Sequence, residues 1–168
     1  MKSNLILIGM PGSGKSTVGV ILAKLLGYSF IDSDLLIQKS EGKLLREIIA
    51  EKGIDGFIEV ENRINSGIDA GYSVIATGGS AVYGREAMKH LRTIGTVVYL
   101  RLSCDQLKQR LGNIKNRGVI IRKGQTLSGL YAERLPLYER YADIIIDEDG
   151  CDIEATVEKI LENYKSHL

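Results

Sequence analysis

Residues 9–17 read Gly-Met-Pro-Gly-Ser-Gly-Lys-Ser-Thr and fit the phosphate-binding loop pattern G-x-x-x-x-G-K-[ST]. Glycines in such a loop let backbone N–H groups converge on a polyphosphate, and the helix that follows directs its positive N-terminus at the same anion. Lys15 can then reach the β- and γ-phosphates, and the Ser16 hydroxyl can ligate magnesium. The pattern predicts an ATP-type nucleotide site formed by Gly12, Ser13, Gly14, Lys15, Ser16 and Thr17.

Two acidic residues, Asp32 and Asp34, follow the apolar pair Phe30-Ile31. Carboxylates at the end of a strand beside a phosphate loop can divide two tasks. One can support Mg²⁺ through water, and the other can orient or deprotonate a hydroxyl group of the acceptor. A second interpretation is that Asp34 is only the N-cap of a helix over residues 35–41, a position that aspartate favours.

A glycine pair and four arginines complete the candidates for chemistry. Gly78 and Gly79 follow an apolar run, where paired glycines let a ligand approach the backbone closely; a plain turn is the alternative. Phosphoryl transfer needs positive charge on the transferring group, and a carboxylate on the acceptor would need an arginine. The sequence alone singles out none of Arg110, Arg117, Arg122 and Arg134.

Short β-branched apolar runs alternate with helical patterns along the whole chain. Strands are predicted at 5–8, 29–31, 73–76, 96–100 and 143–146. Helices are predicted at 15–26, 34–41, 43–51, 56–70, 81–91, 104–111, 127–141 and 153–166. This order indicates an α/β fold with a parallel sheet covered on both faces. Ligands bind beyond the carboxyl ends of such strands, so the motifs above are expected at one edge of the sheet.

Residues 112–125 depart from the packed pattern, because they combine glycines with basic and amide side chains. A basic loop bounded by glycines and next to a nucleotide site is typical of a mobile lid. An ordinary solvated loop is the alternative.

The composition limits the class of protein and its partners. A chain of 168 residues is predicted to form one domain, and a net charge of +1 argues against nucleic-acid or membrane-surface binding. Cys104 and Cys151 form neither a metal-type pair nor a disulfide framework. The N-terminal apolar run is too short for a membrane span or a signal segment. We expect a cytoplasmic, monomeric protein with a small-molecule substrate.

The chain resembles the shikimate kinase family over nearly its whole length. The resemblance rests on residues 9–17, the Asp32-Ser33-Asp34 segment, the glycine pair and Arg117. Its strongest late match is Arg134-Leu135-Pro136-Leu137-Tyr138, followed by Ala142-Asp143. The resemblance implies a three-layer P-loop kinase fold with five parallel strands in the order 2-3-1-4-5. It also implies Mg-ATP-dependent phosphorylation of the shikimate 3-hydroxyl, with an acceptor-binding helical region at about 34–62 and a lid at about 112–125.

The resemblance implies a role for each matching residue on the nucleotide side. Lys15 would hold phosphates, and Ser16 would ligate the magnesium that Asp32 supports through water. Arg117 would reach from the lid to the transferring phosphate, and Arg110 would stack on adenine.

The resemblance likewise implies the residues of the acceptor pocket. Asp34 would bind and activate the acceptor hydroxyl, and Arg134 would grip the acceptor carboxylate. Gly78 and Gly79 would line the pocket.

Three positions depart from the family pattern, and all three concern acceptor binding or closure. Ile58 stands where the family has an arginine that helps to clamp the carboxylate, Ser80 replaces a third glycine, and Gly118 replaces a proline of the lid. The departures leave two alternatives to shikimate phosphorylation. One is a related kinase with a different hydroxylated acceptor, and the other is a nucleotide-binding protein with weakened catalysis.

Overall fold

Five parallel strands form the centre of the protein in a computed structural model that describes residues 2–111 and 119–166. The strands are β1 (Asn4–Ile8), β2 (Ser29–Asp32), β3 (Ser73–Ala76), β4 (Gly95–Arg101) and β5 (Ile144–Asp147), in the order β2-β3-β1-β4-β5. In the central strand, Ile6 is paired with Ile75 on one side and Val97 on the other. The predicted fold class and strand order are confirmed.

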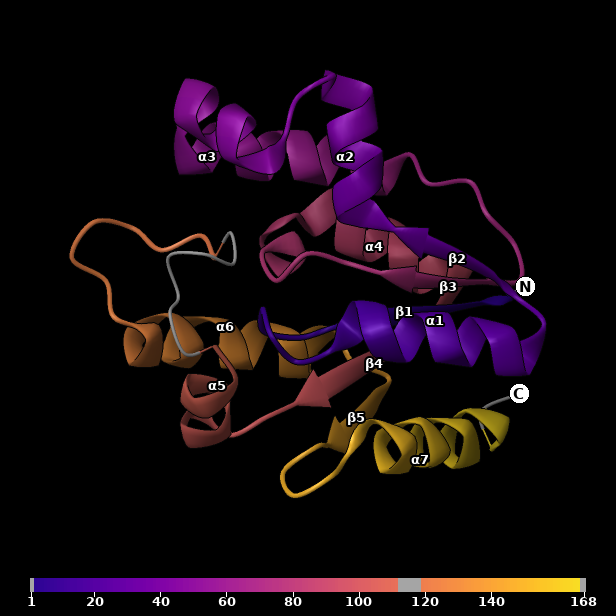
Figure 1. Cartoon of the computed structure of the whole chain (residues 1–168). Coiled ribbons are helices and arrows are strands. Elements are labelled where there is room, and N and C mark those ends of the chain that lie inside the picture. The colour runs from indigo at the N-terminus through magenta and orange to yellow at the C-terminus, as the bar shows by residue number, and fades with distance from the viewer. Residues whose placement is uncertain (1, 112–118, 167–168) are drawn as a thin grey trace.

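Alternation along β1 divides the core into two layers. Leu5 and Leu7 pack under α1 (Lys15–Leu26) and α7 (Ile153–Lys165), whereas Ile6 and Ile8 face α4 (Arg85–Ile94), α5 (Cys104–Leu111) and α6 (Leu127–Tyr141). Figure 1 shows the helices on the two sides of the sheet. Because successive side chains of a strand point to opposite faces, an apolar run such as Leu5-Ile6-Leu7-Ile8 serves both layers at once.

A separate helical layer lies beyond the β2 edge of the sheet (Figure 1). It consists of α2 (Ser33–Glu41) and α3 (Leu45–Ser66), with Ile37, Ile48, Phe57 and Val60 as its own buried cluster. Helix α3 consists of two helical segments that meet at Gly53, in agreement with the two helices predicted at 43–51 and 56–70, and the second segment ends at Ser66. Gly53 has φ 72° and ψ 178°, which are not helical values and which only glycine adopts without strain, so the helical path is interrupted there.

The helix predicted at 81–91 is also different in the structure. Residues Ala81–Tyr83 form a short 3₁₀ helix, η1, and α4 begins only after Gly84. The cause lies in α3, where Asn62 packs against Gly84 and accepts a hydrogen bond from the backbone N–H of Ala87 at 2.9 Å. This contact caps α4 from a distant part of the chain, and so local periodicity does not reveal it.

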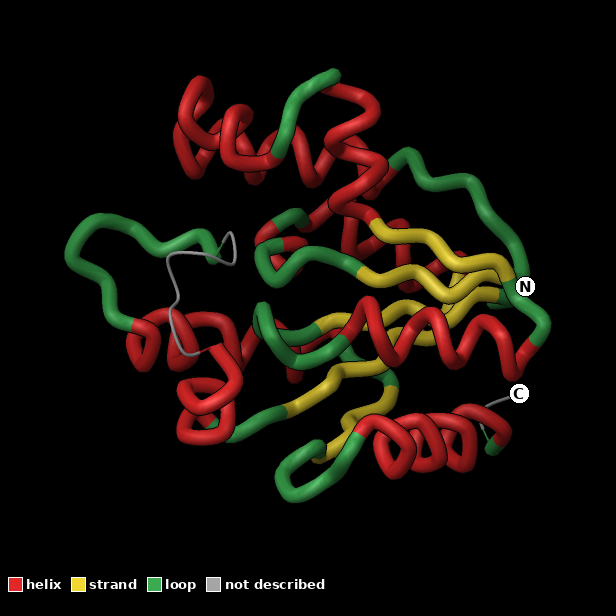
Figure 2. Tube along the Cα trace, in the orientation of Figure 1, coloured by secondary structure: helices red, strands yellow, loops and turns green. Residues whose placement is uncertain are grey.

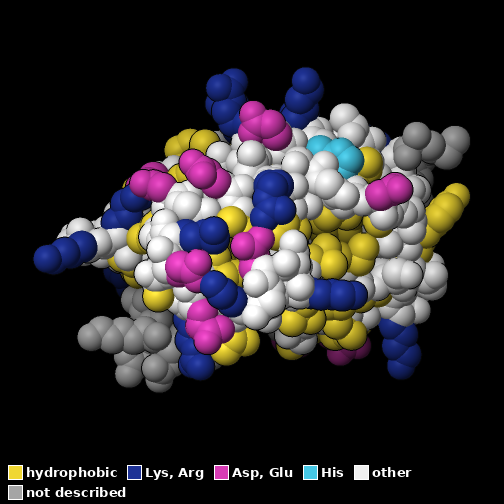
Figure 3. All heavy atoms as spheres, turned by 90° about the horizontal axis from the view of Figure 1, so that it is seen from above, with side chains coloured by type: hydrophobic (Ala, Val, Ile, Leu, Met, Phe, Trp, Pro, Cys, Tyr) yellow, Lys and Arg dark blue, Asp and Glu magenta, His cyan; other side chains and the backbone are white. Residues whose placement is uncertain are grey.

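The other predicted helices agree with the structure to within one residue at each end, and α1, α5 and α6 have the predicted bounds. Among the described residues, no helix is long and apolar enough to cross a membrane. Figure 3 shows basic and acidic side chains interspersed on the face that carries α3 and α4, in keeping with a net charge of +1.

Helix α1 is held to the sheet by side chains such as Leu22, which is fully buried, whereas Leu25 on the same helix is 59% exposed. We expect Leu22→Ala to lower the free energy of unfolding by about 2–5 kcal/mol, because the substitution leaves a cavity behind the phosphate loop. Leu25→Ala is the matched control and should change it by less than about 0.5 kcal/mol. Urea denaturation measures both, and equal losses would contradict this packing.

Candidate active site

A chamber of about 270 Å³ opens at the carboxyl ends of β1 and β3. Figure 2 shows the loops that follow these two strands at the same end of the sheet. The phosphate loop, the glycine turn, Asp34 and Arg134 line this chamber. The apolar side chains of Leu45, Ile49, Phe57 and Ile120 line the remainder. The sheet therefore brings the two predicted halves of the site into one space.

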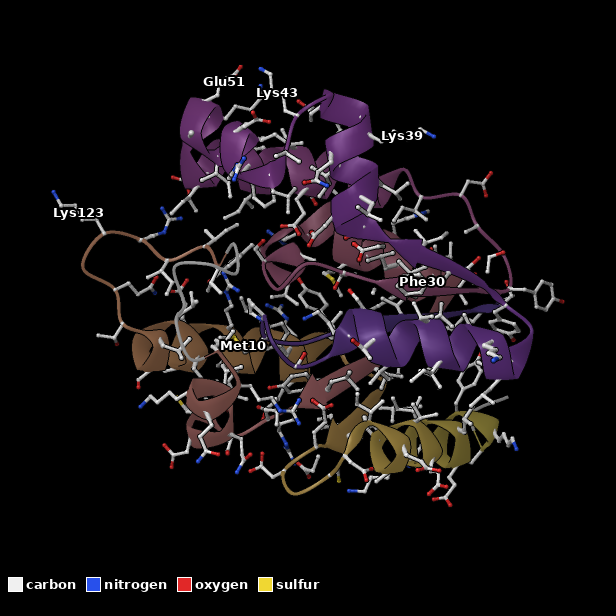
Figure 4. All side chains as sticks on the ribbon, viewed as in Figure 1. Met10, Phe30, Lys39, Lys43, Glu51 and Lys123 are labelled. Atoms are coloured by element: carbon white, nitrogen blue, oxygen red, sulfur yellow. The ribbon has the colours of Figure 1, made fainter. Side chains whose placement is uncertain are left out.

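Positive φ angles shape the phosphate loop. Gly12 and Gly14 have φ 83° and 86°, and a Cβ on Gly12 would lie 2.8 Å from the Leu111 side chain. Gly14 is the N-cap of α1 and provides no side-chain cap, so the first N–H groups of this helix remain available to a phosphate. Figure 4 places Met10 of this loop close to α6, where its sulfur accepts a hydrogen bond from Tyr138 Oη at 3.6 Å.

The ammonium group of Lys15 is buried within the loop. Lys15 Nζ donates to the carbonyl oxygens of Gly9 and Met10, both at 2.8 Å, and to Ser13 Oγ at 3.4 Å. Burial lowers the pKa of Lys15 to about 8, while the nearby carboxylate of Asp34 opposes this shift. The cation is thus placed among neutral acceptors, and an incoming phosphate can supply the missing negative charge.

Asp32 joins the phosphate loop to α2. Its Oδ2 accepts a hydrogen bond from Ser16 Oγ at 3.1 Å, and its Oδ1 accepts one from the backbone N–H of Asp34 at 2.9 Å. Asp32 is therefore the N-cap of α2, and the interpretation of Asp34 as an N-cap is wrong. The helix begins one residue earlier than predicted, since the strand ends directly in the capping residue.

The Ser16–Asp32 pair provides the oxygen donors that Mg²⁺ prefers. In the described ranges 2–111 and 119–166, no group of three or more His, Cys, Asp or Glu side chains could hold a metal ion. This arrangement fits an ion that takes most of its remaining ligands from phosphates and water.

Asp34 lies in the first turn of α2 and faces the chamber. Burial raises the pKa of its carboxyl group, as does repulsion from Asp32, while the charge of Lys15 acts in the opposite direction. A carboxylate whose proton affinity is raised in this way is a better acceptor for the proton of a substrate hydroxyl group.

The glycine turn is packed too closely for any side chain. A Cβ on Gly78 would lie 2.6 Å from Glu61 Oε1 and 3.0 Å from Asp34 Oδ1. A Cβ on Gly79 would lie 2.6 Å from the Pro11 ring and 3.0 Å from Arg134 Nη1. The backbone itself is therefore the surface that a ligand meets at this wall.

Arg134 is a buried cation whose hydrogen-bond partners among the described residues are neutral. It is 1% exposed, and its guanidinium carbon lies 5.3 Å from the centre of the Tyr83 ring. Its Nε donates to Tyr83 Oη at 3.4 Å and its Nη2 to the carbonyl oxygen of Ile120 at 3.3 Å, both long contacts. Within the described part of the chain Arg134 makes no ion pair. A buried, unpaired guanidinium that lines a chamber favours an anionic ligand.

Arg110 and Arg122 do not line this chamber. Arg110, in the last turn of α5, is near Glu148, where its charge counteracts the burial that raises the pKa of Glu148 to about 7. Arg122 forms an ion pair with Asp55 of α3 at 2.5 Å. Arg117 and Gly118 lie outside the described residues, and so the structure covers only the second part of the predicted lid.

Sequence reasoning did not assign a role to Glu61, which is 1% exposed and accepts a hydrogen bond from Ser80 Oγ at 2.6 Å. Its spacing from Phe57, four residues earlier on the same helix, places it on the buried face of α3. An acidic residue at a core position of an amphipathic helix was the available signal.

The parallel sheet, the phosphate loop at the end of β1 and the acidic pair at the end of β2 define a P-loop kinase. The shikimate kinase family model matches residues 11–165. The chain is 38% identical over 170 residues to the shikimate kinase of Moorella thermoacetica, covering 100% of this chain and 98% of that protein. It is 36% identical over 165 residues to that of Thermodesulfovibrio yellowstonii, covering 96% and 95%.

A solved structure of shikimate kinase from Acinetobacter baumannii in complex with shikimate is similar as well. Its TM-score is 0.88 at 32% identity, with 98% of this chain and 94% of that chain covered. The chain therefore belongs to the shikimate kinase family.

The nucleotide half of the site predicts a clear effect of Lys15→Ala. Charge-assisted hydrogen bonds to phosphate oxygens would be lost, and we expect the affinity for ATP to fall about 10- to 100-fold. Lys24→Ala, an exposed lysine on the same helix, is the matched control and should bind ATP normally. Titration with a fluorescent ATP analogue measures both, and equal affinities would show that Lys15 does not contact the nucleotide.

Proposed function

We propose that this protein transfers the γ-phosphate of ATP to the 3-hydroxyl of shikimate. The observation that carries the proposal is Arg134, a buried guanidinium without an ion pair in the described ranges, which shares its chamber with the phosphate loop and Asp34. One small chamber thus offers a site for a polyphosphate, a base and a partner for a carboxylate.

On the nucleotide side, Lys15 and the N-terminal N–H groups of α1 bind the β- and γ-phosphates. Ser16 and Asp32 are the residues that would hold Mg²⁺, which neutralises charge on the phosphates when it is bound. Arg117 is assigned to the transferring phosphate and Arg110 to the adenine, both on the family resemblance. Because Lys15 already bonds to the loop carbonyls, nucleotide binding exchanges neutral partners for an anion without unfolding the loop.

On the acceptor side, Arg134 binds the carboxylate and Asp34 orients the hydroxyl group and accepts its proton. The backbone of Gly78 and Gly79 lies between these two side chains and fixes the distance at which the acceptor ring can approach. The apolar side chains of Leu45, Ile49, Phe57 and Ile120 line the same chamber and offer a surface for the acceptor ring.

Asp34→Asn tests the proposed base. The amide cannot accept the proton, and we expect turnover of shikimate to fall roughly 10²- to 10⁴-fold while ATP affinity stays unchanged. Purified protein with Mg-ATP and shikimate, assayed by coupled ADP release, measures the rate. The proposal fails if the wild type shows no turnover above this variant.

A second candidate function is phosphorylation of a different hydroxylated metabolite. The observation that favours it is Ile58, which with Ile54, Tyr83 and Ile120 forms an apolar surface beside Arg134. Among the described residues that line the chamber, Arg134 is therefore the one arginine that can meet a carboxylate. ADP release measured across a panel of hydroxylated acids, sugars and nucleosides separates the two functions, because only the first predicts shikimate as the best acceptor.

Ile58→Arg tests whether this wall limits the affinity for shikimate. A second guanidinium beside Arg134 would add charge-assisted hydrogen bonds, and we expect the KM for shikimate to fall about tenfold or more. The KM for ATP should stay constant. Ile54→Arg, one turn earlier in α3, is the control for added charge alone, and an equal improvement there would contradict a specific contact.

A further inference from the structure

Glu61 is a buried acid whose two carboxylate oxygens have different surroundings. Ser80 Oγ donates to Glu61 Oε2 at 2.6 Å, whereas Oε1 has no hydrogen-bond partner among residues 2–111 and 119–166. This free oxygen lies against Gly78, since a Cβ there would be only 2.6 Å from it. Glu61 therefore lies directly behind the glycine turn that forms one wall of the chamber, and Ser80 ties it to that turn.

Charged groups from three other elements face Glu61. Asp34 of α2 disfavours its ionised form, while Arg134 of α6 and Lys15 of α1 favour it. The Ser80 hydroxyl also favours the ionised form, and the phenol of Tyr138 lies nearby on α6. Burial outweighs these attractions and raises the pKa of Glu61 to about 7. The acid is accordingly divided between its two protonation states near neutral pH.

We propose that Glu61 is a positioning residue of the acceptor site, which holds the glycine turn through Ser80 and takes up a proton when an anionic acceptor binds at Arg134. The inference rests on the proposed function, because it requires a carboxylate at Arg134. It adds that the charge of the acceptor is balanced by a proton on a residue that does not touch the acceptor.

The direction of the coupling follows from the charges. An acceptor carboxylate cancels part of the positive potential that Arg134 exerts on Glu61, so the pKa of Glu61 rises further above about 7 in the complex. Because the pKa of Glu61 is higher in the complex than in the free enzyme, its protonation strengthens acceptor binding. This contribution is fully present below the pKa of the free enzyme and is lost as the pH rises toward the pKa of the complex. Acceptor binding should therefore weaken above neutral pH.

Calorimetric titration of the full chain with shikimate, in two buffers of different ionisation enthalpy at pH 7, measures proton uptake. We expect the wild type to take up a fraction of one proton and its Kd for shikimate to rise roughly three- to tenfold between about pH 6.5 and 8.5. Glu61→Gln, which stays neutral, should show no uptake and less than about a twofold change in Kd over the same range. Glu59→Gln, an exposed acid on the same helix, should behave as the wild type.

Ser80→Ala provides a second variant that keeps the acid in place. Loss of the hydroxyl donor disfavours the ionised form of Glu61, so the pH of maximal proton uptake should move upward. Shikimate binding without proton uptake in the wild type, or with equal uptake in Glu61→Gln, overturns this inference and leaves the proposed function intact. Absence of any shikimate binding or turnover overturns both.

Discussion

The site depends on the burial of two cations, Lys15 and Arg134, at the carboxyl edge of a parallel sheet. A buried charge is costly unless something offsets it, and the two cations are offset differently. Lys15 is surrounded by carbonyl oxygens of its own loop, so it is prepared for a phosphate before one arrives. Within the part of the chain that the structure describes, the hydrogen bonds of Arg134 are long and go to neutral oxygens, so it gains more from an anionic ligand. The acids Asp34 and Glu61 lie close enough to these cations to contribute to the charge balance.

The second constraint on the site is that the backbone must approach the buried charged side chains closely. Charges interact strongly at this chamber because Lys15 and Arg134, which line it, are buried. The backbone itself forms the wall at Gly78 and Gly79, where any Cβ would displace Glu61, Pro11 or Arg134. The glycine turn thus allows Asp34, Glu61 and Arg134 to lie close to one another. It also limits the orientations in which a ligand can bind.

Contacts that are local in sequence could be predicted, and contacts between distant segments could not. The phosphate loop, the strands and the bounds of α1, α5 and α6 follow from motif and periodicity, whereas the strand order came from the family resemblance. The break predicted between residues 51 and 56 lies at Gly53, whereas the restart of α4 after Gly84 was missed, because it needs a cap from Asn62. The Ser80–Glu61 pair joins residues 19 positions apart, and no periodicity reveals that a hydroxyl and a carboxylate meet.

The two halves of the site are built in different ways, and this difference explains where the chain departs from its family. The phosphate loop comes from one contiguous segment and the helix that follows it, and Lys15 bonds to the carbonyl oxygens of that same segment. The acceptor half is assembled from α2, α3, α6 and the turn after β3, each of which can change a side chain while the others keep their places. Ile58 and Ser80 both lie in this second half. The Ser80 hydroxyl donates a hydrogen bond to Oε2 of Glu61, whose other carboxylate oxygen has no partner among the described residues. A serine at this position therefore changes the charge balance around Arg134, and it does so outside the phosphate loop.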